Sequence, residues 1–182
     1  MGIGLERGIV RLSAYDPEWP RLFEEERQRL QEALGDQVLD IQHVGSTSIP
    51  GCTAKPILDI AMAVESFEAA FACVPLIERL GYEFMGELGI PRRHYFVKRD
   101  PRSTHHIHML ERTSQEYEAQ LLFRDYLRSH PEAVEQYVAL KEGLRQRYPN
   151  DREAYTDGKT EFIKNILSMA KNGFGNTSHD EL

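Results

Sequence analysis

A glycine–serine turn followed by one acidic residue is the feature of the sequence most suited to chemistry. Residues 43–64 read HVGSTSIPGCTAKPILDIAMAV, which predicts a strand, a tight loop that begins at Gly45 and Ser46, and an apolar strand interrupted by Asp59. Backbone N–H groups and hydroxyls in such a loop can bind phosphate, and a carboxylate beside it can bind Mg²⁺. The alternative is an ordinary turn and an acid that a basic side chain or backbone donors satisfy.

Two histidines and a lysine are further candidates. A predicted strand over residues 104–110 places His106 and His108 on one face and His105 on the other, because side chains alternate along a strand. His106 and His108 could bind a metal or a phosphate, or could be hydrogen-bonded sheet residues. Lys55 follows the loop and could reach a phosphate or remain solvated.

Four basic residues crowd another predicted strand, and they stand out in a chain whose formal net charge is −7. They are Arg92, Arg93, Lys98 and Arg99. An arginine fork suits phosphate or carboxylate recognition, but alternation divides the four between two faces. We therefore expect Arg92 or Arg93, together with Lys98, to face the site.

Turn and helix signals indicate the elements that must position these residues. Asp16 is expected to cap a helix whose first position is Pro17 and which ends at Gly35. A second helical segment follows Ser66 and kinks or restarts at Pro75. The remaining predicted elements are an edge strand at residues 9–12, strands at residues 38–44, 92–99 and 104–110, and three helices that begin near residues 114, 131 and 149.

This order of elements predicts an α+β fold. Residues 1–112 would form a mixed α/β core, residues 113–171 a unit of about three helices, and residues 172–182 a disordered tail. The junction at residues 111–114 is too short for a flexible linker, so we expect the helical unit to pack on the core as one body.

Composition restricts the possible partners and compartment. The net charge of −7 argues against a nucleic-acid-coating surface. The two cysteines, Cys52 and Cys73, match neither a zinc nor a redox spacing. No apolar run reaches the roughly 18 residues of a membrane span, and the N-terminus lacks a signal-peptide pattern. We therefore expect a cytoplasmic protein without a membrane or nucleic-acid partner.

Several blocks of the sequence together resemble the GrpB family. They are HVGSTSIPGCTAKPILDIAMAV, RRHYFVKRDP, THHIHML, FRDYLRSHPE and YPNDREAYTDGKTEFI, in the family's order and between about residues 8 and 170. The resemblance implies a nucleotidyltransferase-like fold, a mixed sheet flanked by helices, and a domain that is also found fused to dephospho-coenzyme A kinases.

The resemblance also implies a reaction, the transfer of a nucleoside monophosphate from an NTP to an unknown acceptor. Gly45, Ser46 and Ser48 would then hold the triphosphate, and Asp59 would be the catalytic ligand of Mg²⁺ or Mn²⁺, with Zn²⁺ less suitable. Tyr155 and Lys159, which share a helix face, would by analogy cover the base and contact the phosphates.

One position departs from the superfamily pattern, which has a second acid two residues after the first. This chain has Ala61 there. His106 and His108 could supply the missing metal ligands, in which case a metal-dependent enzyme is expected. The alternative is a non-catalytic module that binds a nucleotide or another phosphorylated ligand and is linked to coenzyme A metabolism.

Overall fold

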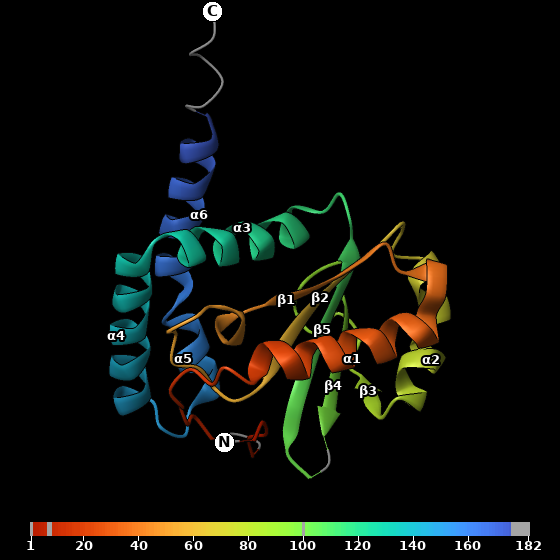
Figure 1. Ribbon diagram of the computed structural model, residues 1–182, viewed down its shortest axis with the longest axis horizontal. Helices are drawn as coiled ribbons and strands as arrows, with labels where there is room; N and C mark the ends of the chain where they lie inside the picture. The colour runs from red at the N-terminus through yellow and green to blue at the C-terminus, as the bar shows by residue number, and fades with distance from the viewer. Residues whose placement is uncertain (1, 7–8, 100, 176–182) are drawn as a thin grey trace, which may run out of the picture.

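The protein is described from a computed structural model that covers residues 2–6, 9–99 and 101–175 (Figure 1). Within these residues the strands are β1 Asp40–Val44, β2 Leu58–Val64, β3 Tyr82–Phe84, β4 His94–Arg99 and β5 Ser103–Glu111. The helices are α1 Trp19–Leu34, α2 Val74–Arg79, α3 Gln115–Ser129, α4 Pro131–Arg147, α5 Arg152–Asp157 and α6 Thr160–Gly175. This is the mixed α+β arrangement that the sequence predicted.

The described strands form one five-stranded sheet in the order β1-β2-β5-β4-β3. The central pair, β2 and β5, is parallel, and every other neighbouring pair is antiparallel. The β2–β5 register pairs Asp59 with His106 and Ala61 with His108. The β4–β5 register places Tyr95 opposite His108. Strand pairing therefore gathers the acid and both histidines of interest at the centre of the sheet.

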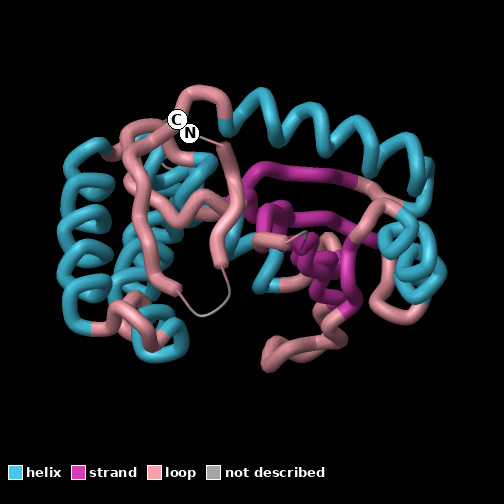
Figure 2. The backbone as a smooth tube through the Cα atoms, turned by 90° about the horizontal axis from the view of Figure 1, so that it is seen from below, coloured by secondary structure: helices cyan, strands magenta, loops and turns pink. Residues whose placement is uncertain are grey.

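One face of the sheet is packed against α1 and α2. Leu30 and Leu34, four residues apart on α1, meet Ile60 and Met62, which alternate along β2. Figure 1 shows α1 crossing this face, and the view in Figure 2 shows it lying along the strands. This apolar layer covers one face of the sheet. The alternate residues of β2 point to the opposite face.

The opposite face is partly covered by α3, while α4, α5 and α6 gather at one end of the molecule (Figures 1 and 2). Ala61 and Ala63 of β2 pack against Tyr117 of α3. The Tyr117 hydroxyl also donates to Asp40 on β1 at 2.9 Å. A separate apolar cluster joins α3, α4 and α6 through Phe123, Tyr137 and Ile166.

Most predicted element boundaries agree with the structure. Helix α1 ends at Gly35, where φ is 54°, as predicted. It begins at Trp19, two residues later than predicted, because the Asp16 carboxylate accepts from the Glu18 N–H at 3.0 Å in the turn before the helix. Helix α4 starts at Pro131, and Pro75 lies in the first turn of α2.

Three local features differ from the sequence prediction. Residues 9–12 form no strand, because the Val10 N–H donates to Pro149 O at 3.2 Å and not to a strand of the sheet. The three-residue β3 and the six-residue α5 had no predicted counterpart. Helix α6 runs on to Gly175, so residues 172–175 of the predicted tail are helical, and the rest of that tail lies outside the described residues.

Candidate functional site

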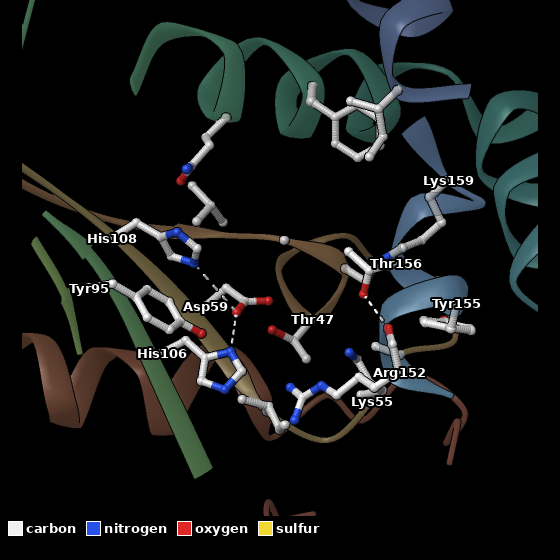
Figure 3. A pocket seen from close by; sticks show the side chains of 18 of the residues that line it. Thr47, Lys55, Asp59, Tyr95, His106, His108, Arg152, Tyr155, Thr156 and Lys159 are labelled. Carbon is white, nitrogen blue, oxygen red and sulfur yellow. Dashed lines mark hydrogen bonds and ion pairs between the residues drawn. The ribbon is translucent and has the colours of Figure 1, made fainter. Parts of the chain in front are cut away.

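A cavity of about 740 Å³ lies between the open face of the sheet and the helical unit (Figure 3). Its floor is made of the turn after β1 and of residues from β2, β4 and β5. Its other walls come from α3, α4, α5 and α6. Residues more than one hundred positions apart therefore line one pocket, whose volume is that of typical small-molecule sites.

The turn after β1 packs directly against the acid of β2. Gly45 has φ 68°, and a Cβ atom there would lie 2.5 Å from Oδ2 of Asp59. The Ser48 hydroxyl donates to the Gly45 carbonyl at 2.6 Å and closes the turn. Gly45 and Ser46 line the pocket, whereas Ser48 is buried with its hydroxyl used inside the loop. Only a glycine permits this approach of loop and carboxylate.

Two imidazoles meet the carboxylate of Asp59. Its Oδ1 lies 3.1 Å from Nδ1 of His106 and 3.9 Å from Nε2 of His108, and Figure 3 shows both rings turned toward it. Burial alone raises the pKa of Asp59, but the hydrogen bond with His106 and the nearby His108 hold that pKa well below its usual value. Burial lowers the pKa of His106 although Asp59 opposes the shift, so His106 is neutral near pH 7.

The protonation pattern of the histidines follows from their partners. Ionised Asp59 can only accept, so His106 carries its hydrogen on Nδ1. His108 Nδ1 lies 3.2 Å from a guanidinium nitrogen of Arg93, which can only donate, so His108 carries its hydrogen on Nε2, toward Asp59. Arg93 also stacks on Tyr95 at 4.6 Å and donates to the Leu88 carbonyl at 2.9 Å, so it fixes the loop above the pocket.

Five cationic side chains line the pocket, and we call three of them, from two distant segments, the cation cluster: Lys55, Arg152 and Lys159. Burial, then the charges of Arg152 and Lys159, lower the pKa of Lys55 to about 7. Burial lowers the pKa of Lys159 to about 8, although Asp59 opposes the shift. Among the described residues, no carboxylate forms an ion pair with any of the three side chains.

Tyr155 lies between the two lysines of the cation cluster. It is 1% exposed, and the ammonium groups of Lys55 and Lys159 lie 5.4 and 5.0 Å from its ring centroid. Such cation–π contacts hold the lysines without neutralising them. The predicted pair Tyr155 and Lys159 is thus at the pocket, but Tyr155 lies on the short helix α5 and Lys159 in the turn before α6, so the two do not share one helix.

Two functional candidates escaped the sequence prediction, Arg152 and Lys141. Lys141 is 2% exposed, and its Nζ donates to Ser46 Oγ at 3.1 Å and to the Thr53 carbonyl, with Cys52 Sγ at 3.0 Å. It ties α4 to the loop that follows Gly45. The only available signal was its position four residues after Tyr137 on an otherwise apolar helix face.

Two predicted residues lie away from the pocket. Lys98 pairs with Glu26 of α1 at 2.9 Å, because its register partners Tyr82 and His105 belong to the opposite face of the sheet. Arg92 is on the surface and pairs with Glu68 and Glu111 at 3.0 and 2.9 Å. The expectation that Lys98 faces the site is wrong. Of the alternatives Arg92 and Arg93, Arg93 contacts His108, and Arg99, which was not expected there, lines the pocket.

The donor set does not fit a pair of Mg²⁺ ions. Ala61, at the position of the second acid, is fully buried against α3. His106 and His108 direct N–H groups at Asp59, and Mg²⁺ prefers oxygen ligands. In the described part of the chain, no group of three or more His, Cys, Asp or Glu side chains is placed to hold a metal ion. The cation cluster supplies the positive charge in this pocket.

Comparisons with known proteins agree with this fold. The family model described as GrpB protein matches residues 9–169. The chain is 41% identical to the UPF0157 protein YqkA of Bacillus subtilis over 89% of its own length, and spans about half (47%) of that relative. The crystal structure of conserved protein GrpB from Enterococcus faecalis superimposes with a TM-score of 0.85 at 38% identity, covering 91% of this chain and 100% of that one.

Other relatives are named dephospho-CoA kinase. A dephospho-CoA kinase of Mycolicibacterium paratuberculosis is 29% identical over 91% of this chain, and the match spans 47% of that protein.

No helix in the described ranges is long and apolar enough to cross a membrane.

Proposed function

The chain belongs to the GrpB protein family, and we propose that its pocket binds a phosphorylated small molecule of nucleotide size. The observation that carries this proposal is the cation cluster, because Lys55, Arg152 and Lys159 line one cavity and none of them forms an ion pair with a carboxylate of the described residues. Holding three half-buried cations close together without ion-pair partners is costly. A bound polyanion removes that cost and makes charge-assisted hydrogen bonds.

The pocket has a second, apolar end that supports a ligand larger than phosphate. Phe123 of α3 and Ile163 and Leu167 of α6 line it. A ligand with phosphates at the cation cluster and a base or another apolar group at this end would fill both parts. Relatives named dephospho-CoA kinase make ATP and dephospho-CoA the first compounds to test.

Transfer of a nucleotidyl group is the finer proposal for the same pocket. Asp59 lies beside the Gly45 turn, which is the relation that the nucleotidyltransferase resemblance implies. The absence of a second acid at Ala61 means that the cation cluster would have to stabilise phosphate charge that metals usually stabilise. A Mg²⁺ or Mn²⁺ ion brought in by the NTP phosphates remains part of this finer proposal.

Titration calorimetry tests the binding proposal. ATP, the other NTPs, dephospho-CoA and inorganic triphosphate are each titrated with and without Mg²⁺ or Mn²⁺. The variants Lys55→Met and Lys159→Met should each weaken binding by about tenfold or more, because each removes a charged contact. Lys164→Met is the matched control, since Lys164 lies on α6 and pairs with exposed Glu161 at 2.9 Å.

The outcomes separate binding from transfer. Failure of every phosphorylated compound to bind, or equal effects of Lys164→Met and Lys159→Met, would contradict the proposed function. Release of pyrophosphate from an NTP in the presence of a metabolite mixture, lost in Asp59→Asn, would support nucleotidyl transfer. Binding without pyrophosphate release under any metal condition would leave a binding module.

A further inference from the structure

We propose that Nε2 of His106 is a nucleophile that takes a phosphoryl group from the bound ligand, with Asp59 as the positioning residue. The inference rests on the proposed function in one respect, because it requires a phosphate at the cation cluster. It adds a covalent phosphohistidine step that uses the residues of this chain alone.

The first support is the orientation of the His106 ring. Nδ1 lies 3.1 Å from Oδ1 of Asp59, and this contact leaves the lone pair on Nε2. Within the described residues, no hydrogen-bond partner occupies Nε2. His106 lines the pocket, and Figure 3 shows its second nitrogen on the side of the ring away from Asp59. The ring is thus fixed at one nitrogen and free at the other.

His108 cannot take this role although it shares the pocket. Its Nδ1 faces the Arg93 guanidinium at 3.2 Å, and its Nε2 faces Asp59 at 3.9 Å. Both of its ring nitrogens therefore have partners. This difference selects His106 over His108 as the nucleophile.

The charges around His106 suit attack on phosphorus. Attack turns the imidazole into a cation, which the Asp59 carboxylate stabilises through Nδ1. The cation cluster stabilises the negative phosphoryl oxygens in the same pocket. Arg152 is near enough to act electrostatically on His106. A nucleophile, its orienting acid and phosphate-binding groups thus meet in one cavity.

The step balances as follows for a phosphate ester or anhydride. The lone pair of Nε2 forms the N–P bond, the P–O bond to the leaving group breaks, and its electron pair stays on the leaving oxygen. That oxygen takes a proton from an ammonium of the cation cluster or leaves as an anion. Water or an acceptor hydroxyl later attacks phosphorus, loses its proton, and returns the electron pair of the N–P bond to Nε2.

Phosphoramidate is the probe for this step, because it donates a phosphoryl group to nucleophilic imidazoles and releases ammonia. The full chain is incubated with phosphoramidate near neutral pH and analysed by intact mass and peptide mapping. We expect a gain of one phosphoryl group on His106, stable in alkali and labile in acid. Inorganic triphosphate in the same mixture should slow labelling, because it occupies the cation cluster.

Two variants and a control make the assignment specific. His106→Asn keeps an amide N–H where Nδ1 donates to Asp59 but lacks Nε2, so labelling at position 106 should disappear while the fold is kept. Asp59→Asn should slow labelling of His106 by about 10²-fold. His130→Asn is the control and should leave the labelling of His106 unchanged, because His130 lies outside the pocket. Like His106, His130 has a hydrogen-bond partner at Nδ1, the Tyr126 carbonyl at 2.8 Å.

Each other outcome overturns the inference. No adduct on the wild type, an adduct elsewhere only, equal labelling of the wild type and His106→Asn, or labelling of His106 that triphosphate does not slow would remove the special reactivity of His106. Calorimetric binding of a phosphorylated ligand without any His106 adduct would overturn the nucleophile and leave the binding proposal standing. Absence of both binding and adduct would overturn both.

Discussion

Position 45 leaves no room for a side chain beside the Asp59 carboxylate. In Gly45→Ala the new Cβ would lie 2.5 Å from Oδ2 of Asp59, and the residue would also keep φ 68°. The left-handed backbone costs about 1–2 kcal/mol for a residue with a Cβ, and the collision adds to it. We expect a loss of unfolding free energy of about 2–4 kcal/mol in urea denaturation, with loss of ligand binding.

Gly51 provides the control for this prediction. It has φ 78°, in the same loop, but nothing lies within 4 Å of a Cβ built there. Gly51→Ala should therefore show the backbone cost of about 1–2 kcal/mol alone and keep ligand affinity. Equal stability and equal binding of the two variants would mean that the contact with Asp59 is not tight.

The lowered pKa values of Lys55 and Lys159 imply that the free energy of unfolding and the affinity for anions change in opposite directions with pH. Their pKa values, about 7 for Lys55 and about 8 for Lys159, lie below the ordinary value. Between about pH 7 and 10 these two lysines therefore bind more protons in the unfolded chain than in the folded one. Their contribution to the free energy of unfolding rises with pH in this range. Anion binding weakens over the same range, because the folded lysines lose their charge.

Wild type and Lys55→Met compared at pH 7 and pH 9 test both trends. Urea denaturation should show that the wild type gains stability relative to the variant at the higher pH. Calorimetry with inorganic triphosphate should show weaker binding at pH 9 and proton uptake on binding at pH 8. A stability difference that is the same at both values would show that Lys55 titrates normally.

At the residue level, the sequence predicted the site residues whose positions follow from side-chain alternation along a strand or from their place in the loop. Asp59, His106 and His108 meet because of the β2–β5 register, and parity alone put the two histidines on one face. The prediction for Lys98 was wrong because side-chain alternation does not tell which of the two faces of the sheet holds the pocket. Arg152 and Lys141 were missed because their partners lie far away in the chain, and only tertiary packing brings them together.

At the scale of elements, α3 clamps the strand that leads into the Gly45 turn. Arg124 of α3 donates to Gln42 Oε1 at 2.8 Å and to the His43 carbonyl at 3.1 Å. Arg128, one turn later, donates to the Ser48 carbonyl at 2.9 Å. These bonds satisfy polar groups that would otherwise be buried without partners. Helix α3 therefore fixes the end of β1 and the loop together.

Removal of this clamp should be costly. Arg124→Met should lower the unfolding free energy by about 1–3 kcal/mol, because the His43 carbonyl loses a buried donor. Arg145→Met is the control, since Arg145 forms a half-exposed ion pair with Glu142 at 2.9 Å, which is expected to contribute less than about 1 kcal/mol. Chemical denaturation of both variants compares the two costs, and similar losses would argue against a structural role for the α3 clamp.

Element types were predictable where the chain carries strong local signals. The C-terminal end of α1 and the start of α4 follow from Gly35 and Pro131, which act through backbone geometry alone. The strand β3 has three residues and α5 has six, too few to show a period. Their existence depends on pairing with β4 and on the contact of Tyr155 with the pocket, which are tertiary effects.

At the scale of the whole molecule, the sheet separates a structural side from a binding side. Helices α1 and α2 close one face with apolar side chains, and the pocket occupies the other face under the helical unit. The cation cluster draws Lys55 from the sheet side and Arg152 and Lys159 from the helical side. A ligand phosphate at this cluster must therefore join two parts of the chain that strand pairing does not connect.

Hydrogen exchange should reveal this division. With saturating ATP or inorganic triphosphate, amides of residues 45–59 and 152–163 should exchange more slowly together, because bound phosphate couples the two walls. Amides of α1 and α2 should change little, since the sheet separates them from the ligand. A ligand at 100 times its dissociation constant should also add about 2.7 kcal/mol of stability. The Lys55→Met/Lys159→Met double variant should lose the local protection at both walls. Protection confined to one wall, or centred on α1, would place the ligand elsewhere and remove the reason for assigning Asp59 and His106 to its chemistry.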